Sequence, residues 1–517
     1  MSHKITLTLT PKQASDPKFY TSLAARKVGI TESDVALLRV VKRSIDARQR
    51  QAKVNLTVEL FEESDPTPDP IHFDYPDVAH RTPVVVVGSG PAGLFAALRL
   101  IELGFRPIIL ERGRDVSARK KDIALINRNE AIDPNSNYAF GEGGAGTFSD
   151  GKLFTRSKKR GDYHKALQTL VFHGASEEIL FEAHPHIGTD KLPRIMTNMR
   201  QSILDAGGDF IFEAKVTDLK IKGERIEGVW CGDTLYEGAA VVLATGHSAK
   251  DIYELLHAKG VLIEAKPFAM GVRIEHPQGL IDSIQYHAPS RGEYLPAASY
   301  SLVNQENGRG VYSFCMCPGG FIVPAMTDKS ESVVNGMSPS QRSSPYANSG
   351  LVTEVRLSDF AHLADEWGEL AGLKFQQQLE MLARKHGGEN QIAPAQRVSD
   401  FVAGRGSGSL PSSSYIPGFC TSRLDQWLPD FIGSGLRAGL TTFDRRLRGF
   451  ITPEALVAGV ESRTSSPVRI PRDRETLMHP QISGLFPAGE GAGYAGGIIS
   501  AALDGERIAG AVADFIR

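Results

Sequence analysis

Apolar and polar residues alternate along the opening of the chain. In "ITLTLT" every second side chain is apolar, which is the period of a half-buried β-strand. Three further elements are predicted from similar patterns: a helix over 16–29 and strands over 35–45 and 53–61. Asp16 is the candidate cap of the helix and Gly29 its stop. These elements predict a small N-terminal α/β domain over 1–76, followed by a linker with five prolines.

A different pattern begins after the linker. The apolar run "VVVV" predicts a buried strand, "GSGPAG" a glycine turn, "LFAALRL" an apolar helix and "PIIL" a second strand. This order is that of a Rossmann dinucleotide-binding unit. Gly88 permits the tight turn, Gly90 lets the backbone approach a pyrophosphate, and Gly93 allows close contact between helix and strand. The helix starting at Pro91 points its N–H groups and its dipole at the phosphates.

An acidic residue follows the second strand of this unit. Glu111 stands 18 residues after Gly93. A carboxylate at this position accepts hydrogen bonds from an adenosine ribose and repels a 2′-phosphate. The interpretation is therefore a dinucleotide site without a 2′-phosphate.

Two other segments spell the same glycine pattern but lack its context. "GEGGAG", 141–146, has no buried strand before it and no apolar helix after it, so we predict a glycine-rich loop lying against a cofactor or, alternatively, a flexible surface loop. After "GAGYAG", 491–496, only 21 residues remain, too few for a helix and a second strand. That segment must complete a sheet begun elsewhere, so the sequence predicts one dinucleotide approached by three glycine segments.

Features outside the first turn favour FAD over NAD. "AAVVLATGH", 239–247, is similar to the "ATG" strand of FAD-binding folds. "GLFPAGEGAG", 484–493, is similar to the element that contacts the ribityl chain of the flavin, although Glu490 stands where most such proteins have Asp. The chain has no second complete βαβ unit that could bind NAD(P)H. NAD(P)H is therefore expected only as a transient reductant.

Several long segments carry a resemblance to one family. They include "KRSIDAR", "GEGGAGTFSDGKL", "PHIGTDKL", "ATGHSAKD", "YSFCMCPGGF", "ESRTSSPVRI" and "GEGAGYAGGI". Over nearly its whole length the chain resembles a family of bacterial FAD-dependent dehydrogenases, often called simply FAD-dependent proteins, with an FAD fold of the two-dinucleotide-domain type. The resemblance implies FAD binding and a redox role and supplies no substrate.

The expected fold is α/β. We predict a Rossmann-type FAD-binding domain, glutathione-reductase-like or related, over 78–260 plus 455–517, with an α+β substrate domain inserted over 261–454. The residues expected to contact FAD are Gly88, Ser89, Gly90, Pro91, Ala92, Gly93, Glu111, Gly143, Gly144, Gly146, Thr147, Ala244, Thr245, Gly246, Gly489, Glu490, Gly496, Gly497 and Ile498.

The candidate reactive residues are Cys315, Cys317, His276 and Arg463. In a strand, the cysteines of "FCMC" face one side, and a thiolate near a flavin exchanges electrons with it. The competing interpretation is a pair of small buried residues, because C-x-x-C is the usual redox spacing. Arg273 or an arginine of 463–474 is the candidate source of positive charge near the thiols. His276 is a candidate proton donor or a structural histidine, and Arg463 a candidate anion stabiliser or a surface residue.

Composition narrows the classes of partner. The 517 residues carry a formal net charge of −2, which indicates no strong field for nucleic acid or membrane. No apolar segment is long enough to span a bilayer, no Cys/His set has zinc spacing, and four cysteines indicate a reducing, cytoplasmic location. The prediction is an FAD-dependent oxidoreductase with an unknown small-molecule substrate and an open oligomeric state. The alternative is a flavoprotein that modifies or binds RNA, or docks a partner, through basic residues of the N-terminal domain such as Arg43 and Arg48.

Overall fold

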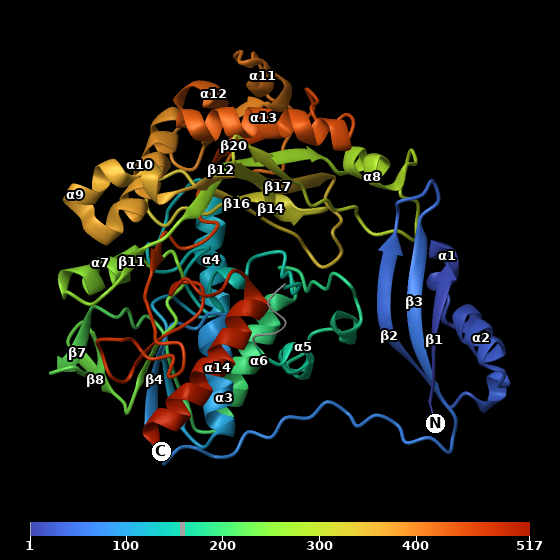
Figure 1. Ribbon diagram of the computed structural model, residues 1–517, viewed down its shortest axis with the longest axis horizontal. Helices are drawn as coiled ribbons and strands as arrows, with labels where there is room; N and C mark the ends of the chain where they lie inside the picture. Colours follow the sequence, from blue (N-terminus) through green and yellow to red (C-terminus); the bar gives the residue numbers. More distant parts are fainter. Residues whose placement is uncertain (1, 156–160) are drawn as a thin grey trace.

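The computed structural model describes residues 2–155 and 161–517. Three of its sheets organise the chain: a three-stranded sheet near the N-terminus, a five-stranded parallel sheet, and a seven-stranded sheet above it in Figure 1. The N-terminal unit stands to one side, and a long connection runs from it beneath the body to the parallel sheet. The elements of the N-terminal unit are predicted from local patterns, whereas the two larger sheets require pairing between distant segments.

The N-terminal unit has the predicted elements. Its strands pair antiparallel in the order β1 (His3–Leu9), β3 (Lys53–Phe61) and β2 (Leu37–Asp46), and helices α1 (Pro11–Ala14) and α2 (Pro17–Val28) accompany them. Asp16 caps α2 by accepting from the N–H groups of Lys18 and Phe19, and Gly29 ends it at φ +84°. The predicted helix, its cap and its stop are therefore confirmed.

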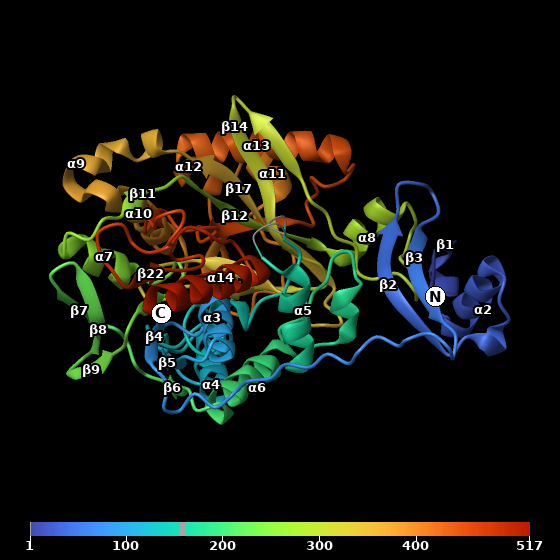
Figure 2. The same ribbon diagram turned by 60° about the horizontal axis from the view of Figure 1, so that its bottom comes forward.

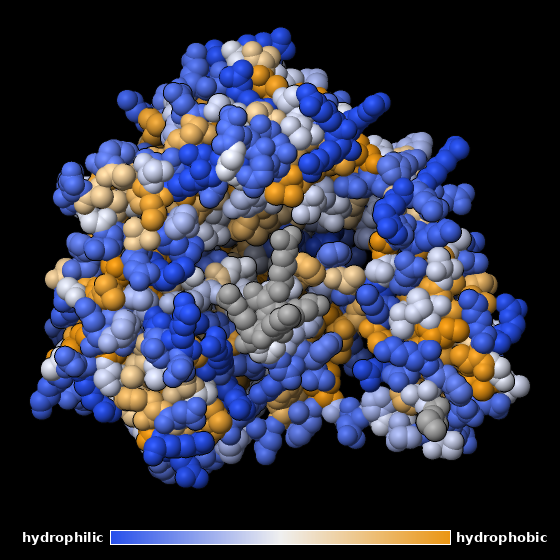
Figure 3. All heavy atoms as spheres, in the orientation of Figure 1, coloured by the Kyte–Doolittle hydropathy of each residue, from blue (hydrophilic) through white to orange (hydrophobic). Residues whose placement is uncertain are grey.

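One basic residue of the N-terminal unit joins it to the body. The N–H of Arg43 donates to the carbonyl of Phe181 at 2.8 Å, and its Nε lies 2.5 Å from Glu182 Oε1. Arg48 is paired with Asp46 at 2.6 Å. Two basic side chains of the N-terminal unit are thus engaged within the chain. On the face shown in Figure 3 a gap separates the lower part of this unit from the body.

The parallel sheet has the strand order of a doubly wound fold. Its strands run in the order β22 (Leu485–Pro487), β10 (Val241–Leu243), β4 (Pro83–Val87), β5 (Arg106–Leu110) and β6 (Asp209–Ile211). All four neighbouring pairs are parallel. The C-terminal strand β22 joins this sheet beside β10, as the shortage of chain after 496 predicts.

Helices from opposite ends of this unit pack together on one face of the sheet. Helix α3 (Pro91–Glu102) follows the first glycine turn, and α14 (Ile498–Ile516) lies against it in both ribbon views. A side chain at Gly505 would collide with the carbonyl of Ala92, so the two helices approach at backbone distance. The other helices around this unit are α4 (Val116–Asn127), α5 (Tyr163–Phe172), α6 (Leu192–Asp205) and α7 (Lys250–Ala258).

The connection from β6 to β10 is a small antiparallel sheet. It consists of β7 (Asp218–Lys222), β8 (Arg225–Cys231) and β9 (Thr234–Glu237), which contact the face of the parallel sheet opposite α3. The predicted run of short strands before "ATG" is therefore present.

The seven-stranded sheet is built from the middle of the chain. Its order is β13 (Val303–Glu306), β14 (Arg309–Cys317), β17 (Tyr346–Val355), β12 (Phe268–Pro277), β20 (Leu456–Glu461), β18 (Ala393–Arg397) and β19 (Phe419–Thr421). Strand β20 lies beyond residue 454, so the sheet extends past the predicted end of the inserted unit. A hairpin of β15 (Phe321–Pro324) and β16 (Val334–Met337) lies beside it, and β11 (Glu264–Ala265) pairs with β21 (Val468–Arg469).

Helices cover the outer face of the seven-stranded sheet. They are α8 (Gln278–Tyr286), α10 (Ala371–His386), α11 (Val398–Ala403), α12 (Leu424–Trp427) and α13 (Asp430–Arg446). The short helix α9 (Ala364–Trp367) lies to one side, next to α10. Met270, Val272 and Ile274 on β12 enter an apolar core with the buried face of α13. Arg273 therefore points to the opposite face of the sheet, toward the parallel sheet. Across the described ranges, no helix combines the length and the apolar character needed to cross a bilayer.

Candidate functional site

A cavity lies between the ends of the parallel strands and the inner face of the seven-stranded sheet. It contains about 1800 Å³ of space free of protein atoms, including its open mouth. Fifteen predicted FAD contacts line it: Gly88, Ser89, Gly90, Pro91, Ala92, Glu111, Gly144, Gly146, Ala244, Thr245, Gly246, Glu490, Gly496, Gly497 and Ile498. The remaining four, Gly93, Gly143, Thr147 and Gly489, are outside its lining. Segments far apart in the sequence therefore meet at one site.

The first glycine turn leaves backbone exposed where the cavity begins. Gly88 has φ +102°, and a Cβ there would lie 2.5 Å from the carbonyl oxygen of Ala244. A Cβ on Gly93 would collide with the carbonyl of Gly88. Gly90 caps α3. A Cβ added at Gly90 would have the Cα of Gly144 as its nearest neighbour, at 4.0 Å. Gly88 and Gly93 are thus required by packing, whereas Gly90 leaves open space at a helix N-terminus, which suits a pyrophosphate.

The second glycine segment is the predicted loop. Its short 3₁₀ turn, Gly144–Gly146, brings Gly144 against Gly90, where a Cβ would lie 3.1 Å from the Gly90 Cα. The buried guanidinium of Arg119 holds the segment before this turn by donating to the carbonyls of Asn137, Tyr138 and Glu142 at 2.8–3.1 Å. No local pattern indicates this role of Arg119, because its partners are carbonyls of a segment without regular structure.

Glu111 is held by four donors of the chain itself. Its Oε2 accepts from the N–H and hydroxyl of Ser89 at 3.1 and 2.6 Å, and its Oε1 accepts from the N–H groups of Gly113 and Gly141 at 2.9 and 3.0 Å. The carboxylate therefore ties the first glycine turn to the second glycine segment.

The C-terminal segment brings a second helix N-terminus to the cavity. Helix α14 begins at Ile498, with Gly497 as its cap at φ +123°, beside the start of α3. Gly489 lies behind the wall, and its N–H donates to Asp504 Oδ2 at 2.7 Å. Two helix dipoles thus end at one cavity, an arrangement that stabilises the anionic phosphates of a dinucleotide.

Glu490 meets the segment that follows β10. Its Oε2 lies 3.5 Å from Nδ1 of His247, and both residues line the cavity. Gly491 has no room for a side chain, since a Cβ would lie 2.6 Å from the carbonyl oxygen of Gly246. His247 was predicted only as part of the "ATGH" segment, and its contact with Glu490 links residues 243 positions apart, beyond the reach of a local pattern.

The wall opposite the glycine segments comes from the seven-stranded sheet and its hairpin. Cys315, Cys317, Asn335, Gly336 and Thr464 are among its residues, and Lys152 reaches it from the other side. Lys152 donates to the carbonyl of Met316. Cys315 is exposed toward the cavity, whereas Cys317 is 1% exposed. The structure therefore brings both predicted cysteines to the cavity.

The thiols do not follow simple alternation. Strand β14 pairs Phe314 with Gly350 and Cys317 with Asn348, so three steps on β14 face two on β17. Cys315 has φ +44°, outside the extended range of a strand. The expectation of a regular strand is wrong here because an extra residue forms a β-bulge. The bulge turns the side chain of Cys315 to the cavity.

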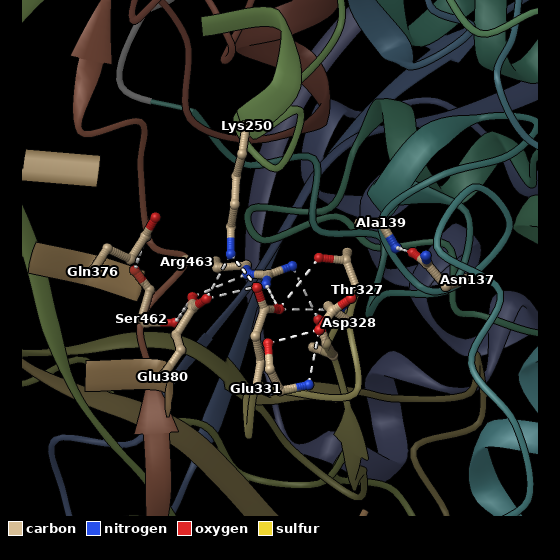
Figure 4. Close-up of polar contacts among 12 residues, drawn as sticks. Asn137, Ala139, Lys250, Thr327, Asp328, Glu331, Gln376, Glu380, Ser462 and Arg463 are labelled. Atoms are coloured by element: carbon tan, nitrogen blue, oxygen red, sulfur yellow. Dashed lines mark hydrogen bonds and ion pairs between the residues drawn. The ribbon is translucent and has the colours of Figure 1, made fainter. Parts of the chain in front are cut away.

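Arg463 lines the cavity, but its guanidinium is already neutralised. It contacts Glu331 Oε2 at 2.6 Å and Glu380 Oε1 at 3.2 Å, and Lys250 donates to both carboxylates. Figure 4 shows these four side chains converging from separate segments. The burial of Glu380 alone raises its pKa, but Arg463 and Lys250 outweigh this and hold the pKa at about 2. Two cations thus face two carboxylates, so this cluster adds no net charge to the cavity.

His276 is not brought to the cavity. It lies on β12 on the face that packs against the outer helices, where its Nε2 is 2.8 Å from the carbonyl oxygen of Phe450. Burial lowers the pKa of His276 to about 4. Strand alternation places His276 on the face opposite Arg273, and its burial there keeps it a neutral core histidine.

The described parts of the chain also contain no cluster of three or more residues arranged to hold a metal.

The chain matches known proteins along most of its length. The family described as "FAD-dependent protein, C-terminal domain-like" matches residues 267–464, "FAD binding domain" matches 81–128, and a domain of unknown function matches 1–61. An uncharacterized protein of Clostridium beijerinckii is 40% identical over 507 residues, covering 94% of this chain and 93% of that protein. A probable electron transfer flavoprotein-quinone oxidoreductase of Escherichia coli, YdiS, is 28% identical over 165 residues, 31% of this chain and 36% of that one.

Solved flavoprotein structures are more distantly similar. The flavin-dependent brominase Bmp2 has a TM-score of 0.37 at 13% identity, with 84% of this chain and 79% of that chain covered. A geranylgeranyl bacteriochlorophyll reductase-like protein of Thermoplasma acidophilum has a TM-score of 0.34 at 11% identity, with 84% and 78% covered. Likenesses of this size do not bear on the reaction.

A glycine turn between a parallel strand and a helix, matched by an FAD-binding domain over the same residues, defines an FAD-binding flavoprotein. The chain belongs to the family of FAD-dependent proteins.

Proposed function

We propose that this protein is an FAD-dependent dehydrogenase or reductase that passes a hydride or electrons between a small molecule and the flavin. The observation that carries the proposal is one cavity with two chemically different faces. Its lower face has the glycine segments and two helix N-termini, and its upper face has two thiols and Asn335. A bound flavin supplies the redox chemistry, and the upper face is where a substrate would bind.

The residues of the lower face have separate roles in this proposal. The N–H groups at the starts of α3 and α14 would hold the pyrophosphate, with Gly90 giving it room. Glu111 would accept from the adenosine ribose, and Glu490 from the ribityl chain. The strand order, with β22 returned from the C-terminus, supports a glutathione-reductase-like or related FAD domain.

The wider organisation remains part of the proposal. We assign an N-terminal domain to 1–76, the FAD domain to 78–260 and the C-terminal residues, and a substrate domain between them that includes β20. Four free cysteines support a reducing, cytoplasmic setting. NAD(P)H would reach the flavin only transiently, and the substrate stays open.

Anaerobic reduction of the purified protein tests this function. The protein should contain one FAD per chain, and NADH, NADPH or one member of a metabolite panel should bleach the flavin absorbance in a stopped-flow instrument. Flavin that none of these donors reduces would contradict an oxidoreductase. Two dinucleotides per chain would contradict the single site.

Replacing Glu490 tests its contact with the cofactor. A lost hydrogen bond to a charged group costs about 1.5–3 kcal/mol. Glu490→Ala should therefore weaken FAD binding to the apoprotein by about 10- to 100-fold in a fluorescence titration. Glu475→Ala, which removes an exposed carboxylate from the preceding loop, is the matched control. Equal affinities in the two variants would remove Glu490 from the site.

A further inference from the structure

The segment Cys315–Cys317 places two sulfurs at the cavity that the FAD-binding glycines line. In a regular strand, residues two apart have Cα atoms about 6.6 Å apart. A disulfide requires about 4.4–6.8 Å. Because three steps of β14 face two of β17, the bulge shortens the span between the cysteines. The spacing of the pair along the chain is therefore compatible with a disulfide bond.

Two cations hold this segment. Arg273, which is fully buried, donates through Nη2 to the carbonyl of Cys315 at 2.9 Å and to Cys317 Sγ at 3.4 Å. Lys152 donates to the carbonyl of Met316. One carboxylate, Glu461, faces Arg273 at 3.2 Å. The guanidinium of Arg273 therefore contacts both the backbone of Cys315 and the sulfur of Cys317.

The wall is shaped so that Arg273 can reach this position. Gly336 lines the cavity, and a side chain there would collide with the guanidinium of Arg273. A Cβ added at Gly320 would lie 3.1 Å from the Cβ of Cys317. The glycines on both sides therefore let the guanidinium and the second thiol pack directly behind the cavity surface.

We propose that Cys315 and Cys317 are a second redox centre, a dithiol–disulfide pair that exchanges two electrons with FAD. The inference rests on the proposed function. In the forward step the two S–H bonds break and one S–S bond forms. The two sulfurs together lose two electrons and two protons, and the oxidised flavin takes up both electrons and both protons. The reverse step returns them to the disulfide, so no further oxidant is needed.

The two sulfurs have different surroundings. Although Cys315 faces the open cavity, protein surrounds its side chain, and this burial raises the pKa of its thiol to about 11. Cys315 is therefore a protonated thiol at neutral pH. Cys317 is buried behind the cavity surface, where its Sγ contacts Arg273 Nη2 at 3.4 Å.

An anaerobic reductive titration of the wild-type holoprotein measures the second centre directly. After oxidation in air, dithionite should deliver four electrons per FAD, two to the flavin and two to the disulfide. The unfolded, oxidised protein should show two of its four cysteines as free thiols, and all four after reduction. Two electrons per FAD together with four free thiols would overturn the proposal. Neither measurement needs a variant.

Single replacements locate the centre. Cys315→Ser and Cys317→Ser should each lower the uptake to two electrons per FAD. Cys420→Ser, a free and half-buried cysteine outside the cavity lining, should keep four. Four electrons in both cavity variants would overturn the assignment. A chain that binds no FAD would refute the proposed function itself, whereas a chain with FAD and two electrons would refute only the dithiol.

Discussion

Replacing Gly90 with valine should abolish FAD binding while leaving the protein folded. The nearest atom to a Cβ at this position is 4.0 Å away, so the chain itself accommodates the added side chain. The valine would occupy the space at the N-terminus of α3 where the pyrophosphate is expected. Affinity should fall by at least about 1000-fold, roughly 4 kcal/mol, because the phosphates lose their backbone donors. The measurement is the FAD content of the purified protein and a titration of the apoprotein.

A second glycine separates this steric effect from a general loss of stability. Gly408 is exposed and has no atom within 4 Å of a Cβ position, so Gly408→Val introduces the same side chain in open space. This variant should keep one FAD per chain. Circular dichroism should show Gly90→Val folded. Full FAD content in Gly90→Val would contradict the placement of the pyrophosphate.

Removing the carboxylate of Glu380 should cost about 3–5 kcal/mol of unfolding free energy, the usual cost of breaking a buried ion pair from one side. Glu380 is fully buried and accepts from Ser462 at 2.6 Å as well as from Lys250 at 2.9 Å. Glu380→Gln leaves two buried cations facing one carboxylate. Denaturant unfolding measures the change. Glu254→Gln, at an exposed pair with Lys374, should change stability by less than about 1 kcal/mol.

The same pair gives an expected pH dependence. The pKa of Glu380 is about 2 in the folded protein, below its ordinary value of 4.5. Its contribution is therefore fully present above the unfolded pKa and is lost as the pH falls from about 4.5 to 2. Wild type should lose stability over this interval more steeply than Glu380→Gln. Identical slopes would show that the carboxylate is not held ionised by Arg463 and Lys250.

The elements that the sequence predicts best are those set by neighbours in the chain. The first glycine turn was predicted because strand, turn and helix lie within thirty residues and each glycine has a local reason. The C-terminal return was predicted from the shortage of chain after Gly496. Both predictions rest on chain connectivity and local sterics.

The features that the sequence missed depend on distant partners. Arg463 has the local pattern of a free cation, but its carboxylates come from Glu331 and Glu380, which precede it by more than eighty residues. The bulge at Cys315 follows from its pairing with β17, which a single strand does not encode. His276 was a candidate because of its residue type. It lies on the face of β12 that the outer helices cover, and a single strand does not show which face that is.

The position of β22 has a consequence for biosynthesis. The first strand of the FAD sheet, β4, ends at Val87, and its sheet gains β22 only after Pro487 is made, about 400 residues later. At about 5–20 residues per second, translation of that interval takes roughly 20 to 80 seconds. During this time the apolar helix α3 lacks α14, the partner that covers it. The cofactor site is therefore complete only after β22 and α14 have left the ribosome.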